Sequence, residues 1–291
     1  MQGGHDAVTS LIRDFLFQGN SFKPDCMKKM LHTILLALAA TGAHAQSLED
    51  VAQLEVLPGW RGADGTHIAG LRITLADGWK TYWRAPGDGG IPPDISLSGS
   101  ENIAGADFHW PVPEVFYQSG LRSVGYQSSI VVPMRIDPED DGGSITVSGT
   151  ISIGVCEEIC IPVEFPIQAV LPPSGNRDSS IVAALINRPQ TAEEAGVTAA
   201  TCRLQPTGGA MELTTRVSLP NLRGDEDIVI ETGDPQIWVS EPSVTISNGM
   251  IEATSDLVHV AHSSFALDRS AVRITILGSG RAVDVQGCTG G

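Results

Sequence analysis

Two cysteines, Cys156 and Cys160, are the side chains of this sequence best suited to chemistry. Cysteines can form a disulfide with each other, exchange it with the thiolate of another protein, or bind a soft metal ion. In a straight strand their Cα atoms would lie about 13 Å apart, beyond the roughly 7 Å limit for a disulfide. The chain must therefore turn between them. A hairpin with residues 157–159 at its tip or one helical turn would suffice, and the β-rich flanks with Pro162 favour the hairpin.

The possible disulfides of the chain close rings of very different size. In the loop-entropy description a Cys156–Cys160 bond stabilises the fold by only about 2 kcal/mol, whereas a bond between Cys202 and Cys288 contributes roughly 4.6 kcal/mol. We therefore expect a structural disulfide at Cys202 and Cys288 and a redox-active pair at Cys156 and Cys160. The alternative for the Cys156–Cys160 bond is a purely structural disulfide that stabilises the hairpin.

Two acidic residues, Glu157 and Glu158, lie between the cysteines of the short ring. Negative charge beside a thiol disfavours its thiolate, so these cysteines should be weak spontaneous nucleophiles. Such a pair is better suited to attack by the activated cysteine of a partner, through a mixed disulfide. Either glutamate could accept a proton during exchange, and a solvated charge at the hairpin tip is the alternative.

Charge and composition exclude several classes of function. The chain has 291 residues with 18 Lys and Arg against 34 Asp and Glu, a formal charge of −16, so a basic face for nucleic acid is not expected. His259 and His262, with Asp256 nearby, lack a third well-placed ligand, so we expect no metal site there. Copper(I) at the two close cysteines is a competing interpretation, because thiolates favour this ion. No cofactor is expected.

The N-terminal region has the pattern of an export signal. From Met27 to Ala45 two lysines precede about a dozen mostly apolar residues and an Ala-x-Ala end, which predicts a signal peptide cleaved after Ala45. Residues 1–26 are interpreted as an upstream extension. We expect a periplasmic protein that is not itself an integral membrane protein, because no apolar run of membrane-spanning length is present. The mature chain keeps four cysteines, an even number that suits two disulfides.

The rest of the chain predicts an all-β protein with two β-sandwich domains and one short linker helix. A break in composition at residues 171–178 divides it into domains at 46–172 and 173–291. A helix is expected at 179–187, capped by Ser179 or Ser180. Alternating apolar residues predict strands at 70–75, 144–153, 211–219, 227–231, 237–239, 243–246, 250–254, 271–277 and 281–285.

Several motifs in order resemble the N-terminal periplasmic domain family of the thiol:disulfide interchange protein DsbD. They occupy residues 78–90 (GWKTYWRAPGDGG), 110–113 (WPVP), 124–126 (VGY), 132–133 (VP) and 154–162 (GVCEEICIP). The resemblance spans about residues 46–170. It implies an immunoglobulin-like sandwich whose cysteine pair cycles between disulfide and dithiol, as a component of a protein-disulfide reductase.

The resemblance also implies roles for particular residues. Cys160 corresponds to the cysteine that forms mixed disulfides, and Phe116, beside Tyr117 in residues 114–117, corresponds to an aromatic lid over the pair. The strand with Tyr82 and Trp83 is expected beside the site. Tyr82 and Tyr126 are candidates for hydrogen bonds near the sulfurs, and ordinary half-buried aromatic residues are the alternative for all of these.

The implied partners are a membrane thiol-electron transporter and periplasmic thioredoxin-like proteins. The chain departs from the full-length family protein because it carries neither the membrane domain nor the thioredoxin-like domain, so we expect the electron donor to be a separate protein. The cysteine spacing is also shorter than the family's. Two hypotheses follow: thiol–disulfide exchange at Cys156 and Cys160, or a non-catalytic binding or assembly module of two sandwiches with structural disulfides.

Overall fold

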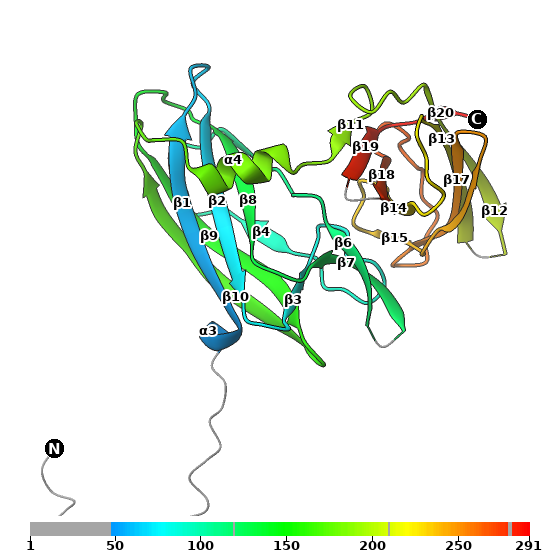
Figure 1. Cartoon of the computed structure of the whole chain (residues 1–291), viewed down its shortest axis with the longest axis horizontal. Helices are drawn as coiled ribbons and strands as arrows, with labels where there is room; N and C mark the ends of the chain where they lie inside the picture. Colours follow the sequence, from blue (N-terminus) through cyan, green and yellow to red (C-terminus); the bar gives the residue numbers. More distant parts are fainter. Residues whose placement is uncertain (1–47, 119, 209, 279–280) are drawn as a thin grey trace, which may run out of the picture. The chain divides into compact units, whose positions relative to one another are not determined.

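The computed structural model describes residues 48–118, 120–208, 210–278 and 281–291. The predicted signal peptide, its cleavage after Ala45 and the upstream extension lie outside the described residues. The prediction of an all-β protein is confirmed, since strands grouped into four sheets make up most of the described chain. Two β-sandwiches are formed, and the first is immunoglobulin-like (Figure 1).

The first sandwich pairs a four-stranded sheet with a six-stranded sheet. The four-stranded sheet has the order β1 (Ala52–Arg61), β2 (His67–Leu75), β8 (Ile130–Asp137), β5 (Gly105–Phe108). The larger sheet has the order β10 (Cys160–Leu171), β9 (Ile145–Cys156), β3 (Lys80–Tyr82), β7 (Leu121–Tyr126), β6 (Glu114–Gln118), with β4 (Asp94–Ser96) also paired to β9. A short helix, α3 (Leu48–Val51), precedes β1.

Alternating apolar residues of both sheets form the first core. Leu71 and Ile73 of β2 pack with Met134 of β8 and Ile151 of β9, and all four are buried. The alternation that predicted strands at 70–75 and 144–153 is the pattern of a sheet with one face turned to the core. The core therefore fixes the register of β9, and β9 ends at Cys156.

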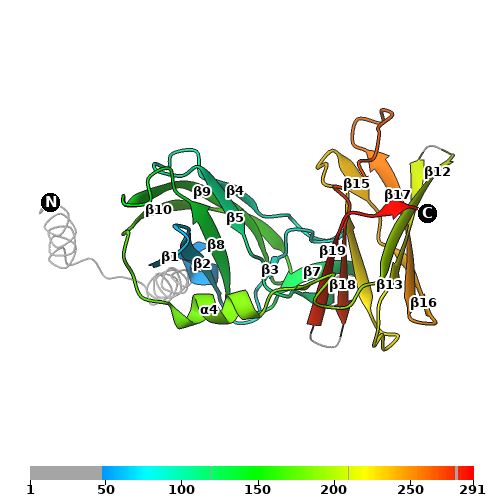
Figure 2. The same cartoon turned by 90° about the horizontal axis from the view of Figure 1, so that it is seen from above.

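The linker helix α4 (Ser179–Ile186) packs against the four-stranded sheet of the first sandwich, as both views show (Figure 2). Ile181 is buried there, within 3.0 Å of where a side chain on Gly70 would begin, so a glycine at 70 lets the helix approach. The expected cap at Ser179 or Ser180 is wrong. Asp178 caps the helix, accepting hydrogen bonds from the backbone of Ser180 (2.8 Å) and Ile181 (3.3 Å). A carboxylate one residue earlier reaches these two amides, which a serine inside the first turn cannot do.

The second sandwich repeats the pairing of a small and a large sheet. One sheet has the order β11 (Gln190–Thr191), β19 (Arg281–Gln286), β18 (Arg273–Gly278), β14 (Asp227–Glu231). The other has the order β15 (Ile237–Val239), β17 (Met250–His259), β13 (Ala210–Ser218), β12 (Ala199–Thr207), β20 (Thr289–Gly290), with β16 (Ser243–Ser247) also paired to β17. Its core includes the buried residues Leu213, Ile251, Leu257 and Ile274.

Candidate functional site

The Cys156–Cys160 disulfide closes the hairpin between β9 and β10. The two cysteines are directly paired across the strands, and their Cα atoms lie 4.1 Å apart. The predicted hairpin, with residues 157–159 at its tip, is confirmed. Cys156 is fully buried, whereas Cys160 is partly exposed, so the two sulfurs differ in their access to solvent.

The register of strand β3 decides which side chains share the face of the sheet with the sulfurs. Lys80 pairs with Cys156, and Thr81 pairs with Val155 on one side and Tyr126 on the other. Successive side chains of a strand point to opposite faces, so Lys80 and Tyr82 lie on the cysteine face. Thr81 and Tyr126 lie on the opposite face of the sheet.

The hydroxyl of Tyr82 contacts both sulfurs. Its oxygen lies 2.9 Å from Cys156 Sγ and 3.1 Å from Cys160 Sγ, and it donates a hydrogen bond to Gly89 O at 3.2 Å. A disulfide sulfur carries no proton, so only the hydroxyl can donate while the pair is oxidised. Burial raises the pKa of Tyr82, which keeps this proton on the phenol. The hydroxyl therefore keeps one proton, which it donates to Gly89 O beside the disulfide and can redirect to a sulfur that becomes a thiolate on reduction.

Phe116 and Ile91 complete the apolar cover of the disulfide. Phe116 is only 8% exposed and packs with Tyr82, their ring centroids 6.5 Å apart at an angle of 24° between planes. The Nζ atom of Lys80 lies 5.9 Å from the centroid of the Phe116 ring, a cation–π contact. Phe116 belongs to strand β6 rather than to a loop, so the cover is built on the sheet itself.

Two glycines allow this close packing around Tyr82. A side chain on Gly154 would begin 2.7 Å from Cβ of Ile91 and 3.0 Å from the Tyr82 ring. A side chain on Gly90 would begin 2.3 Å from Cβ of Pro86 and 2.7 Å from the same ring. Any larger residue at either position would push Tyr82 away from the sulfurs.

Trp83 and Tyr126 were expected around the cysteines, and the structure places them elsewhere. Both are buried in a separate cluster with Val229 and Leu277 of the second sandwich. The hydroxyl of Tyr126 donates to Pro111 O at 2.9 Å rather than to a sulfur. The physical reason is the alternation along the strands, which turns these two side chains away from the face that carries the disulfide.

The remaining expected residues, Tyr117, Glu157 and Glu158, have exposed side chains. Tyr117, next to Phe116 on β6, is 68% exposed, because its side chain points away from the cover. Glu157 and Glu158 are exposed at the hairpin tip beside Ile159, which is 75% exposed. The tip thus presents an apolar side chain that follows two carboxylates in the sequence.

Sequence reasoning missed three contributors to the site: Lys80, Gly89 and Ile91. The position of Lys80, two residues before Tyr82 in one strand, contained the signal, since residues two apart share a face. Gly89 acts through its backbone carbonyl, which no residue pattern reveals. Ile91 is brought to the sulfurs by a loop.

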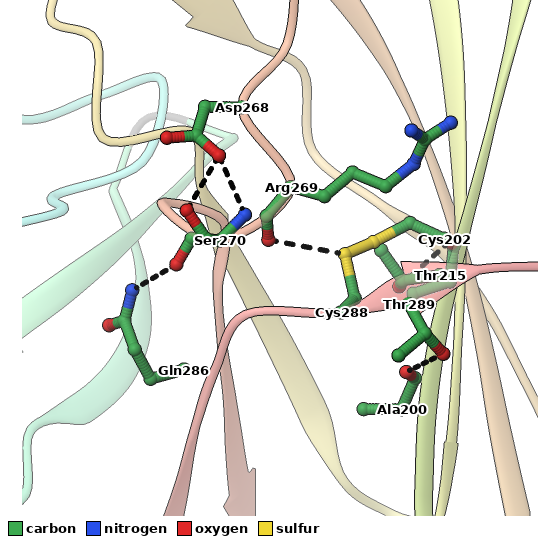
Figure 3. Close-up of a disulfide and its surroundings, with 10 residues drawn as sticks. Ala200, Cys202, Thr215, Asp268, Arg269, Ser270, Gln286, Cys288 and Thr289 are labelled. Carbon is green, nitrogen blue, oxygen red and sulfur yellow. Dashed lines mark hydrogen bonds between the residues drawn. A yellow bond between two sulfur atoms is a disulfide. The ribbon is translucent and has the colours of Figure 1, made fainter.

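The second disulfide, Cys202–Cys288, joins strand β12 to the end of the chain (Figure 3). Cys202 is buried, and the adjoining strand β20 pairs in parallel with β12. The neighbouring turn is ordered by Asp268, whose carboxylate accepts from the backbone and hydroxyl of Ser270 (Figure 3). This pair ties strand β12 to the residue that precedes β20.

Two kinds of feature are absent among the described residues. In the part of the chain that the structure describes, no three or more His, Cys, Asp and Glu side chains gather as a metal site would require. None of the described helices has the length and apolar character needed to cross a bilayer.

The fold and site together define an immunoglobulin-like domain that carries a covered cysteine pair at the end of one hairpin. Residues 48–172 match the family described as "Thiol:disulfide interchange protein DsbD, N-terminal". At the level of that family, the match and the disulfide of Cys156 and Cys160 indicate thiol–disulfide exchange.

A solved structure extends the likeness in fold beyond that domain. The N-terminal periplasmic domain of ScsB from Proteus mirabilis matches with a TM-score of 0.64 and 20% sequence identity, covering 84% of this chain and 96% of that chain. This coverage exceeds residues 48–172, so the similarity includes much of the second sandwich. No curated protein sequence matches the chain.

Proposed function

We propose that this protein is a periplasmic thiol–disulfide exchange protein that cycles Cys156 and Cys160 between disulfide and dithiol. The observation that carries the proposal is the unequal access to the two sulfurs. Cys160 is partly exposed at the start of β10, whereas Cys156 is fully buried beside Tyr82 and Lys80. An incoming thiolate therefore has access to one sulfur, and the other is the leaving group.

The exchange proceeds in two displacements. A thiolate of a partner dithiol attacks Cys160 Sγ, the Cys156–Cys160 bond breaks, and Cys156 leaves as a thiolate that is then protonated. The second thiol of the partner attacks its own sulfur in the mixed disulfide and releases Cys160. Two electrons and two protons have then passed to this protein, and the partner holds a disulfide. The reverse sequence reduces an acceptor.

Neighbouring side chains favour this division of roles. The Tyr82 hydroxyl can donate to the sulfur that leaves, and Lys80 lies directly across the strands from Cys156, where a positive charge stabilises a thiolate. The side chains of Glu157 and Glu158 are exposed at the hairpin tip, between the two cysteines in the sequence. Such a pair reacts with the activated cysteine of a partner more readily than it oxidises other proteins by itself.

The match of residues 48–172 to the family supports the proposed partners and compartment. We infer a membrane thiol-electron transporter as donor and periplasmic thioredoxin-like proteins as acceptors, so that the chain serves as one component of a protein-disulfide reductase. The similar domain of ScsB from Proteus mirabilis is periplasmic, which supports the same compartment for this chain.

Trapping of mixed disulfides tests the proposal. Cys156→Ala and Cys160→Ala are expressed separately in the native host, quenched with acid, alkylated and resolved on non-reducing gels. Cys156→Ala should accumulate covalent partners through Cys160, while Cys160→Ala should accumulate few, because its remaining sulfur is buried. If neither variant traps a partner and the wild-type pair stays oxidised in mild reductant, the protein is a stapled binding module.

A further inference from the structure

Two arginines of the first sandwich are held by acidic residues of the second, within the compact unit Ser47–Gly291. Arg84, just after β3, donates from Nε to Glu231 Oε1 at 3.1 Å and from its terminal nitrogen to Oε2 at 2.9 Å. Its guanidinium also lies 3.9 Å from the centroid of the Trp83 ring. A two-point contact of this kind fixes the orientation of both side chains.

Arg122 on β7 is held in a similar way. Its side chain is only 5% exposed, and its Nε lies 3.4 Å from Asp227 Oδ1 and 3.8 Å from Glu241 Oε1. Its terminal nitrogen donates to the backbone oxygen of Ile228 at 3.2 Å. Removing the acceptors of a buried guanidinium is costly, so these contacts constrain the position of β7 strongly.

Both arginines are connected to segment 84–90, which contacts the cysteine site. Arg84 is its first residue, and the backbone of Arg122 is hydrogen-bonded to it. Within it, Gly89 N donates to Arg122 O at 3.4 Å, and Pro86 O accepts from Val124 N at 2.8 Å. Gly89 O accepts the hydrogen bond of the Tyr82 hydroxyl, which contacts both sulfurs. One residue, Gly89, thereby connects the backbone of Arg122 to the hydroxyl beside the disulfide.

We propose that the second sandwich positions the redox site of the first. Asp227, Glu231 and Glu241 are the positioning residues, which act through the two arginines and segment 84–90 to hold the Tyr82 hydroxyl between the sulfurs. The inference rests on the function proposed above. When two electrons from a partner dithiol break the disulfide, the oriented hydroxyl turns its single proton from Gly89 O to the thiolate and stabilises the reduced form. Loss of the anchors therefore shifts the equilibrium toward the disulfide.

The experiment uses the mature chain with Glu231→Gln and, separately, with Asp227→Asn combined with Glu241→Gln. The matched control is Glu252→Gln, which removes an ion pair with Arg216 inside the second sandwich. The reduced fraction of Cys156 and Cys160 is measured in glutathione redox buffers by alkylation and mass spectrometry. The equilibrium constant for reduction should fall about three- to tenfold in the anchor variants, the range expected for one net hydrogen bond. Glu252→Gln should equal the wild type.

A second set of variants tests the route through Tyr82. In a Tyr82→Phe background the anchor variants should cause no further shift, because the hydroxyl that they position is absent. Shifts of equal size in both backgrounds, or no shift in the original background, would overturn the inference. Thermal unfolding checks whether the variant with both Asp227→Asn and Glu241→Gln is folded. If it is not, the comparison is made with Glu231→Gln alone, because Arg84 keeps its contacts with Trp83 and Thr275 in that variant.

The outcome also separates this inference from the proposed function. A wild-type pair that exchanges with glutathione, together with unshifted anchor variants, overturns only the positioning role of the second sandwich. A wild-type pair that stays oxidised throughout overturns the proposed function, and the positioning role with it.

Discussion

The hydroxyl of Tyr82 lies 2.9 Å from the sulfur of Cys156, and it reaches this position from the neighbouring strand rather than from the hairpin of the cysteines. The same oxygen lies 3.1 Å from Cys160 Sγ. The cysteine pair thus has a buried hydroxyl in contact with both sulfurs, and burial raises the pKa of that hydroxyl. Reactivity of the pair should depend on this donor.

Replacing Tyr82 by phenylalanine should shift the cysteine pair toward its disulfide. The ring is retained, so the apolar cover remains, but the donor to the thiolate is lost. Reduction by glutathione should become about tenfold less favourable, the size of one charge-assisted hydrogen bond. Redox titration with alkylation measures this shift. An unchanged equilibrium constant would mean that the hydroxyl only hydrogen-bonds Gly89 O and does not stabilise the thiolate.

Replacing Lys80 by methionine should slow attack on the disulfide. Lys80 is the cross-strand neighbour of Cys156, so its charge favours departure of Cys156 as a thiolate. We expect a rate of reduction by small thiols about three- to tenfold lower at low ionic strength, and a smaller difference in high salt. Lys80→Arg, which keeps the charge, is the control and should stay near the wild-type rate.

Replacing Phe116 by alanine should open the cover over the sulfurs. Phe116 is 8% exposed and packs with Tyr82 and Cys156, so its removal leaves the disulfide accessible to bulky reagents. The rate of reduction by a bulky phosphine should rise about tenfold relative to the wild type, with some loss of stability from the cavity. Tyr117→Ala is the matched control, since Tyr117 is adjacent in the same strand but 68% exposed. Equal effects of both substitutions would contradict a lid at Phe116.

Mild acid should weaken the fold through His67. This side chain is fully buried, and its Nε2 lies 2.6 Å from Pro58 O; burial lowers its pKa below the ordinary value of 6.5. The folded state then binds fewer protons than the unfolded state, so stability is complete above pH 6.5 and is lost as the pH falls through the folded pKa. The slope for one proton is at most about 1.4 kcal/mol per pH unit.

Urea unfolding between neutral pH and about pH 5 measures this dependence, because that window lies below the unfolded pKa of histidine. His67→Gln should have a shallower slope than the wild type. His109, whose pKa is also lowered by burial, titrates in the same window, so His109→Gln is the comparison. If neither substitution changes the slope of the free energy of unfolding against pH, the loss of stability in acid comes from carboxylates and not from these two histidines.

Removing the Cys202–Cys288 disulfide should destabilise the second sandwich without altering exchange at the first pair. The bond spans a sequence separation of 86, and closing a loop of that size contributes roughly 4.6 kcal/mol in the loop-entropy description. Cys202→Ser with Cys288→Ser should therefore lower the free energy of unfolding by several kcal/mol. Thermal unfolding and the glutathione titration together check both halves of this prediction. A large change in the redox equilibrium of Cys156 and Cys160 would contradict this prediction. It would mean that the site depends on the stability of the whole second sandwich.

Local signals in the sequence were sufficient for the strands and for the turn between the cysteines. Alternation predicted a strand at 227–231, which the structure has as β14 with the same bounds, and at 237–239, which it has as β15. The distance limit of a disulfide required a turn between Cys156 and Cys160, and the structure has a hairpin there. These features depend on residues close in sequence, where backbone geometry leaves few choices.

The surroundings of the sulfurs were decided by the tertiary structure. The sequence indicated aromatic residues near the cysteines, but strand pairing selected Tyr82 and turned Trp83 and Tyr126 to another cluster. It also placed Lys80 opposite Cys156 and brought Gly89 to the Tyr82 hydroxyl. Composition and spacing thus determined that this is a β protein with two cysteines brought together by a turn. Which side chains face that pair depends on the register between strands distant in sequence, and only the folded core fixes that register.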